Sequence, residues 1–248
     1  MVLMKDGSNV EDARLGRLQQ FDERSRNFRT VDLLTSEQQR EPKSWTWNPG
    51  RWLDQGRDGA CVGFAFTHEL VAPPRRVNRM LKDDRLHTFA LEDVYWEAQK
   101  IDPWPGGAYP GADPVYEGTS MLAGAKILKD MGYIEEYRWA FGEEDLFYSV
   151  SWLGPAVIGV NWYEGMFEPN KNGYIEPTGR NMGGHAVVVF RVRVKNTRRD
   201  TEWYEIWNSW GKSWGNEGTA KISREHMSKL LDNNGEAVVP LVRSRERS

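Results

Sequence analysis

The pattern of apolar and polar positions predicts a helical first half of the chain. From Cys61 onward apolar residues recur at helical spacing, and the pattern is interrupted at Pro73-Pro74. A second helix is predicted over residues 90–100, and a third runs from a cap at Thr119-Ser120 to Met131. The middle of the chain is therefore expected to be mainly helical.

The pattern changes after residue 142, where β-rich segments separated by turn residues predict strands. These segments are 155–161, 186–194, 202–207 and 218–223, with a polar hairpin tip over 195–200 and a short strand further back at 44–47. Together they predict an antiparallel sheet or barrel, so the fold class is α+β.

Residues 1–43 are polar and highly charged. Leu15, Leu18 and Phe21 are spaced as the apolar stripe of an amphipathic helix over residues 10–28. The segment is too polar to form a core alone. We expect it to pack across the main body or to stay partly disordered.

Composition excludes several classes of function. The net charge of −3 gives no reason to expect a nucleic-acid partner. A single cysteine excludes an internal disulfide, which fits a reducing compartment. The N-terminus lacks the apolar run of a signal peptide, and no stretch approaches the ~20 apolar residues that span a bilayer. We therefore expect no membrane partner and a cytoplasmic or virion-associated location. With no metal-ligand spacing and no phosphate loop, no metal or cofactor is expected either.

Cys61 is a candidate nucleophile. It follows the turn-forming run of residues 54–59 and begins a helix, where unpaired N–H groups and the helix dipole favour a thiolate. The alternative is that a lone cysteine is a small buried apolar residue.

A cysteine nucleophile needs a base, and geometry separates the four histidines. His68 lies about 10 Å along the same helix, too far to bond the sulfur. His87 and His226 have charged, helical surroundings. His185 follows two glycines and opens the most apolar strand, and Asn208, at the end of the 202–207 strand, can lie beside its ring.

Three motifs can be distinguished: Asp54-Gln55-Gly56 before the cysteine, Gly184-His185-Ala186, and the run from Asn208-Ser209-Trp210-Gly211 through Trp214 to Gly218. Together they resemble the papain-like cysteine peptidases. The run Glu117-Gly118-Thr119-Ser120 before a helix resembles the bacterial and phage branches of this family. The spacing from Cys61 to His185 and Asn208 is close to the ~130–150 residues typical of the family. The similarity covers residues 44–225.

The resemblance implies a role for each matching residue. Cys61 would be the nucleophile, His185 its base and later the acid, and Asn208 the residue that orients the ring. Gln55 would stabilise the oxyanion together with the Cys61 N–H, with Trp210 and Trp214 in support. The residues expected near a polypeptide substrate are Gly118, Gly159, Met182 and Gly184, with Gly106-Gly107 as a rival for the backbone role of Gly118.

The implied fold is two-lobed, with a nucleophile helix in a helical lobe packed against an antiparallel β-barrel-like lobe. The peptidase domain is predicted over 44–235, with lobes over 57–140 and 141–235 plus the strand near 45, followed by a tail over 236–248. Only residues 1–43 precede this domain, whereas the family commonly carries a long inhibitory prosegment. Either the activity of this enzyme is controlled in a different way from that of the family, or residues 1–43 lie in or near the cleft.

The resemblance implies a thiol peptidase. One alternative is an inactive papain-like domain with a binding or structural role, in which a virion or other assembly would be the partner. The other is an acyltransferase that uses the same thioester.

Overall fold

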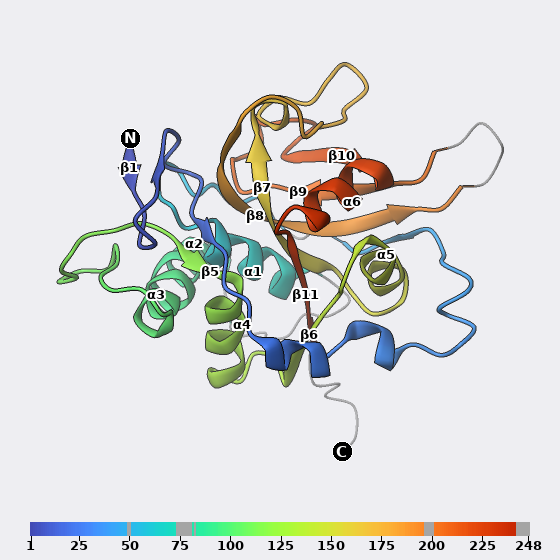
Figure 1. Cartoon of the computed structure of the whole chain (residues 1–248), viewed down its shortest axis with the longest axis horizontal. Coiled ribbons are helices and arrows are strands. Elements are labelled where there is room, and N and C mark those ends of the chain that lie inside the picture. The colour runs from blue at the N-terminus through green and yellow to red at the C-terminus, as the bar shows by residue number, and fades with distance from the viewer. Residues whose placement is uncertain (49–50, 73–80, 82, 196–200, 242–248) are drawn as a thin grey trace.

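The computed structural model describes residues 1–48, 51–72, 81, 83–195 and 201–241. It has an α+β, two-lobed architecture, with helices gathered on one side and a twisted sheet on the other (Figure 1). The helical side consists of α1 (Cys61–Val71), α2 (Leu86–Thr88), a π-helical segment (Phe89–Trp96), α3 (Glu97–Ile101) and α4 (Met121–Asp130).

Helix α1 lies in the interior. Every residue from Cys61 to Leu70 is buried, as expected for a helix that is apolar on nearly all sides. Gly63 lets α1 pack directly against the π-helical segment, because a Cβ at this position would lie 2.1 Å from the Ala90 carbonyl oxygen.

Helix α4 begins where its cap was predicted. The Ser120 hydroxyl accepts a hydrogen bond from the Ala123 N–H at 3.1 Å. The helix predicted over 90–100 is also present, although its first part is π-helical. The predicted interruption at Pro73-Pro74 lies outside the described residues.

Within the described residues, the large sheet joins seven strands, all paired antiparallel. The strands are β4 (Trp45–Thr46), β6 (Glu136–Trp139), β7 (Ala156–Tyr163), β8 (Asn181–Arg193), β9 (Trp203–Trp207), β10 (Thr219–Ser223) and β11 (Glu236–Leu241). Their order in the sheet is β10-β9-β8-β7-β11-β6, with β4 also paired to β8. Helices α5 (Glu143–Trp152) and α6 (Arg224–Asp232) complete this lobe.

All four predicted strands of the second half are present, but β8 begins earlier than expected. It starts at Asn181, so His185 lies within the strand instead of opening it, paired with Val160 of β7. Most of the predicted tip over 195–200 lies outside the described residues.

The predicted C-terminal tail over 236–248 is wrong in its first part. Glu236–Leu241 forms β11, which lies between β7 and β6 with Ala237, Val238 and Val239 fully buried. The short run of apolar residues gave no alternation that separated it from a frayed end. The sheet therefore depends on residues beyond 235.

The predicted helix over residues 10–28 is also wrong. This part holds a hairpin of β1 (Val2–Leu3) and β2 (Asn9–Val10), an extended stretch with β3 (Arg17–Leu18), and 3₁₀ turns over Glu23–Asn27 and Thr30–Leu33. Leu15 joins the main core, whereas Leu18 packs in a separate small cluster and Phe21 is 47% exposed. An extended chain can reach two separate clusters, which one helix face cannot do.

The N-terminal stretch runs between the two lobes before turning beneath them (Figure 1). β3 pairs in parallel with β5 (Thr119–Ser120) at the start of α4. Lys5 is fully buried and forms an ion pair with Asp102 at 2.6 Å. The segment expected to pack across the body or to stay disordered is thus an ordered part of the fold.

Candidate active site

Cys61 is fully buried at the first position of α1. The main chain at Gly16, Val62 and Ala186 lies close enough to the sulfur to lower its pKa. Ala186 is the residue after His185, so α1 and β8 bring the predicted nucleophile and base together. Burial raises the pKa of the Cys61 thiol to about 11, and these main-chain contacts lower it by less. The predicted thiolate is therefore not the form present here, because the sulfur is cut off from water.

His185 and Asn208 lie side by side in the structure. The two side chains are joined by a hydrogen bond of 2.8 Å between His185 Nε2 and Asn208 Oδ1. Oδ1 also accepts the Ser209 N–H at 2.8 Å, which identifies it as the oxygen of the amide. Nε2 must therefore carry the proton. The unprotonated Nδ1 has no hydrogen-bond partner in the described part of the chain.

His185 is neutral at pH 7 in this arrangement. Burial lowers the pKa of its imidazole to about 4, and the Asn208 hydrogen bond only partly opposes that effect. The positive charge of nearby Arg14 lowers the pKa further. The cysteine and histidine are thus both uncharged.

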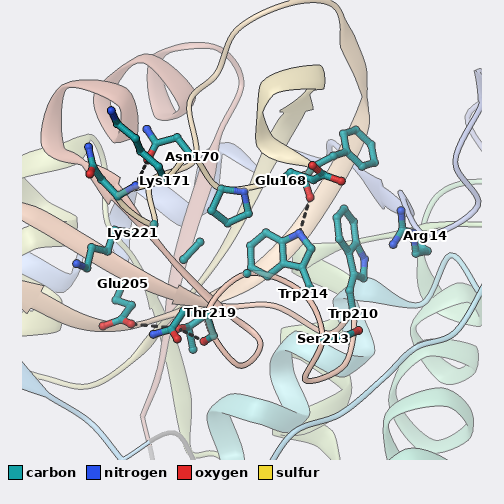
Figure 2. A pocket seen from close by; sticks show the side chains of 17 residues that line it. Arg14, Glu168, Asn170, Lys171, Glu205, Trp210, Ser213, Trp214, Thr219 and Lys221 are labelled. Carbon is teal, nitrogen blue, oxygen red and sulfur yellow. Dashed lines mark hydrogen bonds between the residues drawn. The ribbon is translucent and has the colours of Figure 1, made fainter.

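Aromatic rings surround the His185 imidazole. The Trp210 ring lies 4.8 Å away at a tilt of 34°, and the Trp162 ring approaches edge-on, also at 4.8 Å. The Trp214 indole N–H donates to the Phe167 carbonyl at 2.7 Å, which fixes it on the far side of Trp210 from Arg14 (Figure 2). These rings keep water from the His185–Asn208 hydrogen bond.

Gln55 is fully buried, and both polar atoms of its side-chain amide form hydrogen bonds. Its Oε1 accepts the Ser209 hydroxyl at 2.7 Å, while its Nε2 donates to the Asp58 carbonyl at 2.7 Å and to the Arg14 carbonyl at 3.0 Å. The Gln55 amide therefore already binds a peptide carbonyl from the N-terminal part of the chain.

Residues 10–18, called here the covering segment, lie across this site. Gly16 is pressed against the loop before Cys61 so closely that a Cβ at position 16 would be 1.7 Å from the Gly59 carbonyl oxygen. The Gly16 carbonyl accepts the Thr119 N–H at 2.9 Å. The Arg14 guanidinium carbon lies 4.0 Å over the Trp210 ring. The covering segment thus contacts both lobes and closes off the cysteine.

Comparison with known proteins identifies the family. Residues 109–239, more than half of the chain, match the papain family cysteine proteases. The chain belongs to the papain family.

Relatives and solved structures agree with this membership. The chain is 30% identical over 104 residues to a cysteine protease of Blomia tropicalis, covering 41% of this chain and 30% of that protein. It is 26% identical over 136 residues to cathepsin B-like protease 1 of Arabidopsis thaliana, covering 51% of this chain and 35% of that protein. These matches span about a third of the relatives' lengths. The fold resembles that of xylellain, a cysteine protease from Xylella fastidiosa, with a TM-score of 0.66 and 18% identity, covering 95% of this chain and 99% of that chain.

In this papain-family chain, three of the four residues predicted to lie near a substrate contact the covering segment instead. A Cβ on Gly184 would lie 2.0 Å from the Arg17 carbonyl oxygen, and one on Gly159 would lie 2.9 Å from Arg17 Nε. A Cβ on Gly118 would lie 3.0 Å from the Gly16 carbonyl oxygen. Backbone pairing is made by the next residue, Thr119.

Met182 and the pair Gly106-Gly107 were also predicted to lie near a substrate. Met182 is half-buried and lines one pocket with Arg14 and Phe167 and another with Arg17 and Gly184. The rival pair Gly106-Gly107 packs within its own loop, with the Gly107 N–H donating to the Pro114 carbonyl at 3.1 Å. His68 is buried, with its ring stacked on Trp207 at 4.4 Å.

Sequence reasoning missed four residues of the site: Arg14, Arg17, Trp162 and Glu236. A polar N-terminal stretch gave no signal that two of its arginines enter the cleft. Glu236 forms a buried ion pair with Arg17 of the covering segment, and it was missed because its strand was taken for a tail. Among the described residues, no group of His, Cys, Asp and Glu side chains is arranged to hold a metal ion, and no helix is both long and apolar enough to cross a membrane.

Proposed function

We propose that this protein is a cysteine peptidase that hydrolyses peptide bonds of polypeptides through an acyl-enzyme on Cys61, and that the covering segment holds it latent. The observation that carries the proposal is the hydrogen bond from Gln55 Nε2 to the Arg14 carbonyl at 3.0 Å. An extended polypeptide already lies across the cysteine with a carbonyl on the proposed oxyanion donor. The substrate class is polypeptide, while an assembly partner such as a phage particle stays a prediction.

The proposed reaction starts once substrate replaces the covering segment. The Cys61 proton passes to Nδ1 of His185 and the sulfur bonds to the carbonyl carbon of the scissile peptide. The negative oxygen accepts hydrogen bonds from Gln55 Nε2 and the Cys61 main-chain N–H. Asn208 keeps the imidazole in the orientation that leaves Nδ1 free.

The intermediate then collapses. The C–N bond breaks, His185 donates its proton to the leaving amine, and a thioester remains on Cys61. Water next gives a proton to His185 and adds its oxygen to the thioester carbon. The C–S bond breaks, a carboxylic acid leaves, and the proton returns to the sulfur.

Latency follows from the electrostatics of the covered state. Burial holds the pKa of Cys61 near 11 and that of His185 near 4, so the thiol stays protonated beside a neutral imidazole. A thiol is a far weaker nucleophile than a thiolate. The covering segment therefore blocks access and also suppresses the nucleophile.

The test uses the single cysteine and the close contact at Gly16. We expect iodoacetamide to alkylate wild-type Cys61 slowly at pH 7. Gly16→Ala, whose Cβ would clash with the Gly59 main chain, should displace the covering segment and raise the rate at least tenfold. Adding His185→Ala to this variant should lower the rate again. Gln19→Ala, an exposed change beside the covering segment, is the matched control and should behave as wild type.

Peptidase activity is measured on the same proteins. Gly16→Ala should cleave denatured casein, and Cys61→Ala in that background should not. If Gly16→Ala exposes a reactive thiol but no peptide bond is cleaved, the hydrolase proposal is wrong. The alkylation rate could also depend on pH like that of an ordinary thiol with a pKa of about 8.5, and stay the same when His185 is replaced. In that case the proposal that His185 activates Cys61 is wrong as well.

A further inference from the structure

Glu117 joins the stretch before α4 to the loop that leads into the nucleophile helix. One oxygen of its side chain, Oε2, accepts the Gly59 N–H at 3.2 Å and the Tyr95 hydroxyl at 2.6 Å. Gly59 is buried two residues before Cys61, so its N–H needs a partner inside the protein. The run of residues 117–120, which resembles the bacterial and phage branches of the family, therefore contacts the nucleophile loop through its first residue.

The Tyr95 hydroxyl fixes the Glu117 side chain from the π-helical segment. It accepts the Gly118 N–H at 2.8 Å and a hydrogen of Gln99 Nε2 at 3.0 Å. A hydroxyl accepts at two lone pairs and donates one hydrogen, so the hydrogen of Tyr95 goes to Glu117. Burial raises the pKa of Tyr95 well above its ordinary value, which keeps that hydrogen in place.

The peptide group between Asp58 and Gly59 is held at both of its polar ends. Its N–H donates to Glu117, and its carbonyl accepts a hydrogen of Gln55 Nε2 at 2.7 Å. The Gln55 amide has two hydrogens, and the second one donates to the Arg14 carbonyl, at the position proposed for the oxyanion. The orientation of the Asp58–Gly59 peptide group therefore decides where this second hydrogen points.

We infer that Glu117, supported by Tyr95, is a positioning residue for the oxyanion hole. The inference rests on the proposed peptidase function. Glu117 orients the Asp58–Gly59 peptide group, and this group aims Gln55 Nε2 at the oxygen that becomes negative in the reaction. An oxyanion donor is most effective when its direction is set before the reaction, because no reorganisation is then needed.

Two reactions of Cys61 separate this role from a general effect on the cysteine. Attack on acetyl-leucine p-nitrophenyl ester forms the C–S bond through an oxyanion, and p-nitrophenolate leaves as the ester C–O bond breaks. Alkylation by iodoacetamide forms a C–S bond without an oxyanion. In the Gly16→Ala background, Glu117→Ala should slow the p-nitrophenolate burst at least tenfold and change the alkylation rate less than threefold. The ester concentration at half-maximal burst rate should change less than threefold.

Glu117→Gln and Glu92→Ala are the matched controls in this background. An amide oxygen in the place of Oε2 still accepts from Gly59 and Tyr95, so Glu117→Gln should keep the burst rate within threefold. Glu92 is an exposed carboxylate of the π-helical segment, and Glu92→Ala should leave the rate unchanged. Tyr95→Phe removes the donor to Glu117 and should slow the burst at least threefold. It replaces Glu117→Ala if that variant gives no cooperative melting transition.

A double variant tests whether Glu117 acts through Gln55. In the Gly16→Ala, Gln55→Ala chain, adding Glu117→Ala should slow the burst less than threefold, because the donor that Glu117 positions is already absent. A further tenfold loss in that chain would overturn the inference. Equal losses of burst and alkylation rates in Glu117→Ala, or a Glu117→Gln chain as slow as Glu117→Ala, would overturn it as well.

The burst also separates this inference from the proposed function. It requires acylation of Cys61, but neither release of the acyl group nor cleavage of a peptide bond. A burst that depends on Glu117 in a chain that cleaves no casein would remove the hydrolase proposal and support the positioning role. Casein cleavage and a burst that are both unaffected by Glu117→Ala would do the reverse. If the Gly16→Ala chain gives no burst, both the acyl-enzyme and the positioning role are wrong.

Discussion

The amide nitrogen of Gln55 and the main-chain oxygen of Arg14 are joined by a hydrogen bond of 3.0 Å. Gln55 lies six residues before the cysteine, and Arg14 belongs to the N-terminal segment that crosses the cleft. The bond connects the catalytic proposal with the latency proposal, because under these two proposals the Gln55 amide binds the covering segment in the latent state and the reacting carbonyl in the active state.

Replacing Gln55 should therefore lower the rate more than substrate binding. In the Gly16→Ala background, Gln55→Ala should reduce kcat by about 10²–10³, which corresponds to roughly 3–4 kcal/mol of lost transition-state stabilisation. KM should change less than threefold. Ser209→Ala removes only the hydroxyl that donates to Gln55 Oε1, and it should cost far less. A rise in KM with kcat unchanged would contradict the oxyanion role.

The buried ion pair of Lys5 and Asp102 should be an anchor of the N-terminal segment. Both side chains are fully buried, and Asp102 also accepts the Thr119 hydroxyl at 2.7 Å. Lys5→Met leaves the carboxylate without its cation and should lower the free energy of unfolding by about 3–5 kcal/mol. It should also speed Cys61 alkylation at pH 7.

The double variant is the control for this anchor. Lys5→Met with Asp102→Asn removes both charges, and we expect it to recover much of the lost stability in urea unfolding. Equal loss in the single and double variants would show that packing, not charge, holds this end of the segment.

Acid should destabilise the covered state through His185. Its pKa is about 4 in the folded protein against 6.5 for an exposed histidine, so the unfolded chain binds more protons between these values. The free energy of unfolding should thus fall as pH drops from 6.5 towards 4, by at most about 1.4 kcal/mol per pH unit for this group. Above pH 6.5 the group adds no slope.

Thermal or urea unfolding across pH 4–7 measures this effect. In His185→Gln the free energy of unfolding should depend less steeply on pH than in wild type, by the equivalent of about one proton taken up on unfolding. His68→Gln should do the same, because burial lowers the pKa of His68 to about 3. An unchanged slope in both variants would show that other groups carry the acid sensitivity.

Filling the space beside Arg17 should loosen its ion pair. The Cβ of Gly159→Ala would lie 2.9 Å from Arg17 Nε and 2.8 Å from Met121 Cγ, and both side chains must shift. We expect a loss of about 1–3 kcal/mol in the free energy of unfolding and faster alkylation of Cys61. Unaltered alkylation with reduced stability would show that the covering segment stays in place without this ion pair.

The sequence was sufficient to predict the nucleophile helix, the strands around His185 and Asn208, and the cap at Ser120. These features depend on local signals: helical spacing, runs of β-branched residues, and a hydroxyl before a helix. The motif around Asn208 carries the resemblance to the papain family in the sequence alone. His185 lies in β8 and Asn208 directly follows β9, so the pairing of these two strands brings the two side chains together.

Only the tertiary structure decided what the N-terminal segment does. The spacing of Leu15 and Leu18 fits a helix as well as an extended strand, and the choice depends on the two separate clusters that receive them. The state of Cys61 was decided in the same way, because its pKa follows from burial under residues far away in sequence. Glu236 forms its ion pair with Arg17, which lies more than two hundred positions earlier in the chain. Local sequence patterns carry no information about a partner at that distance.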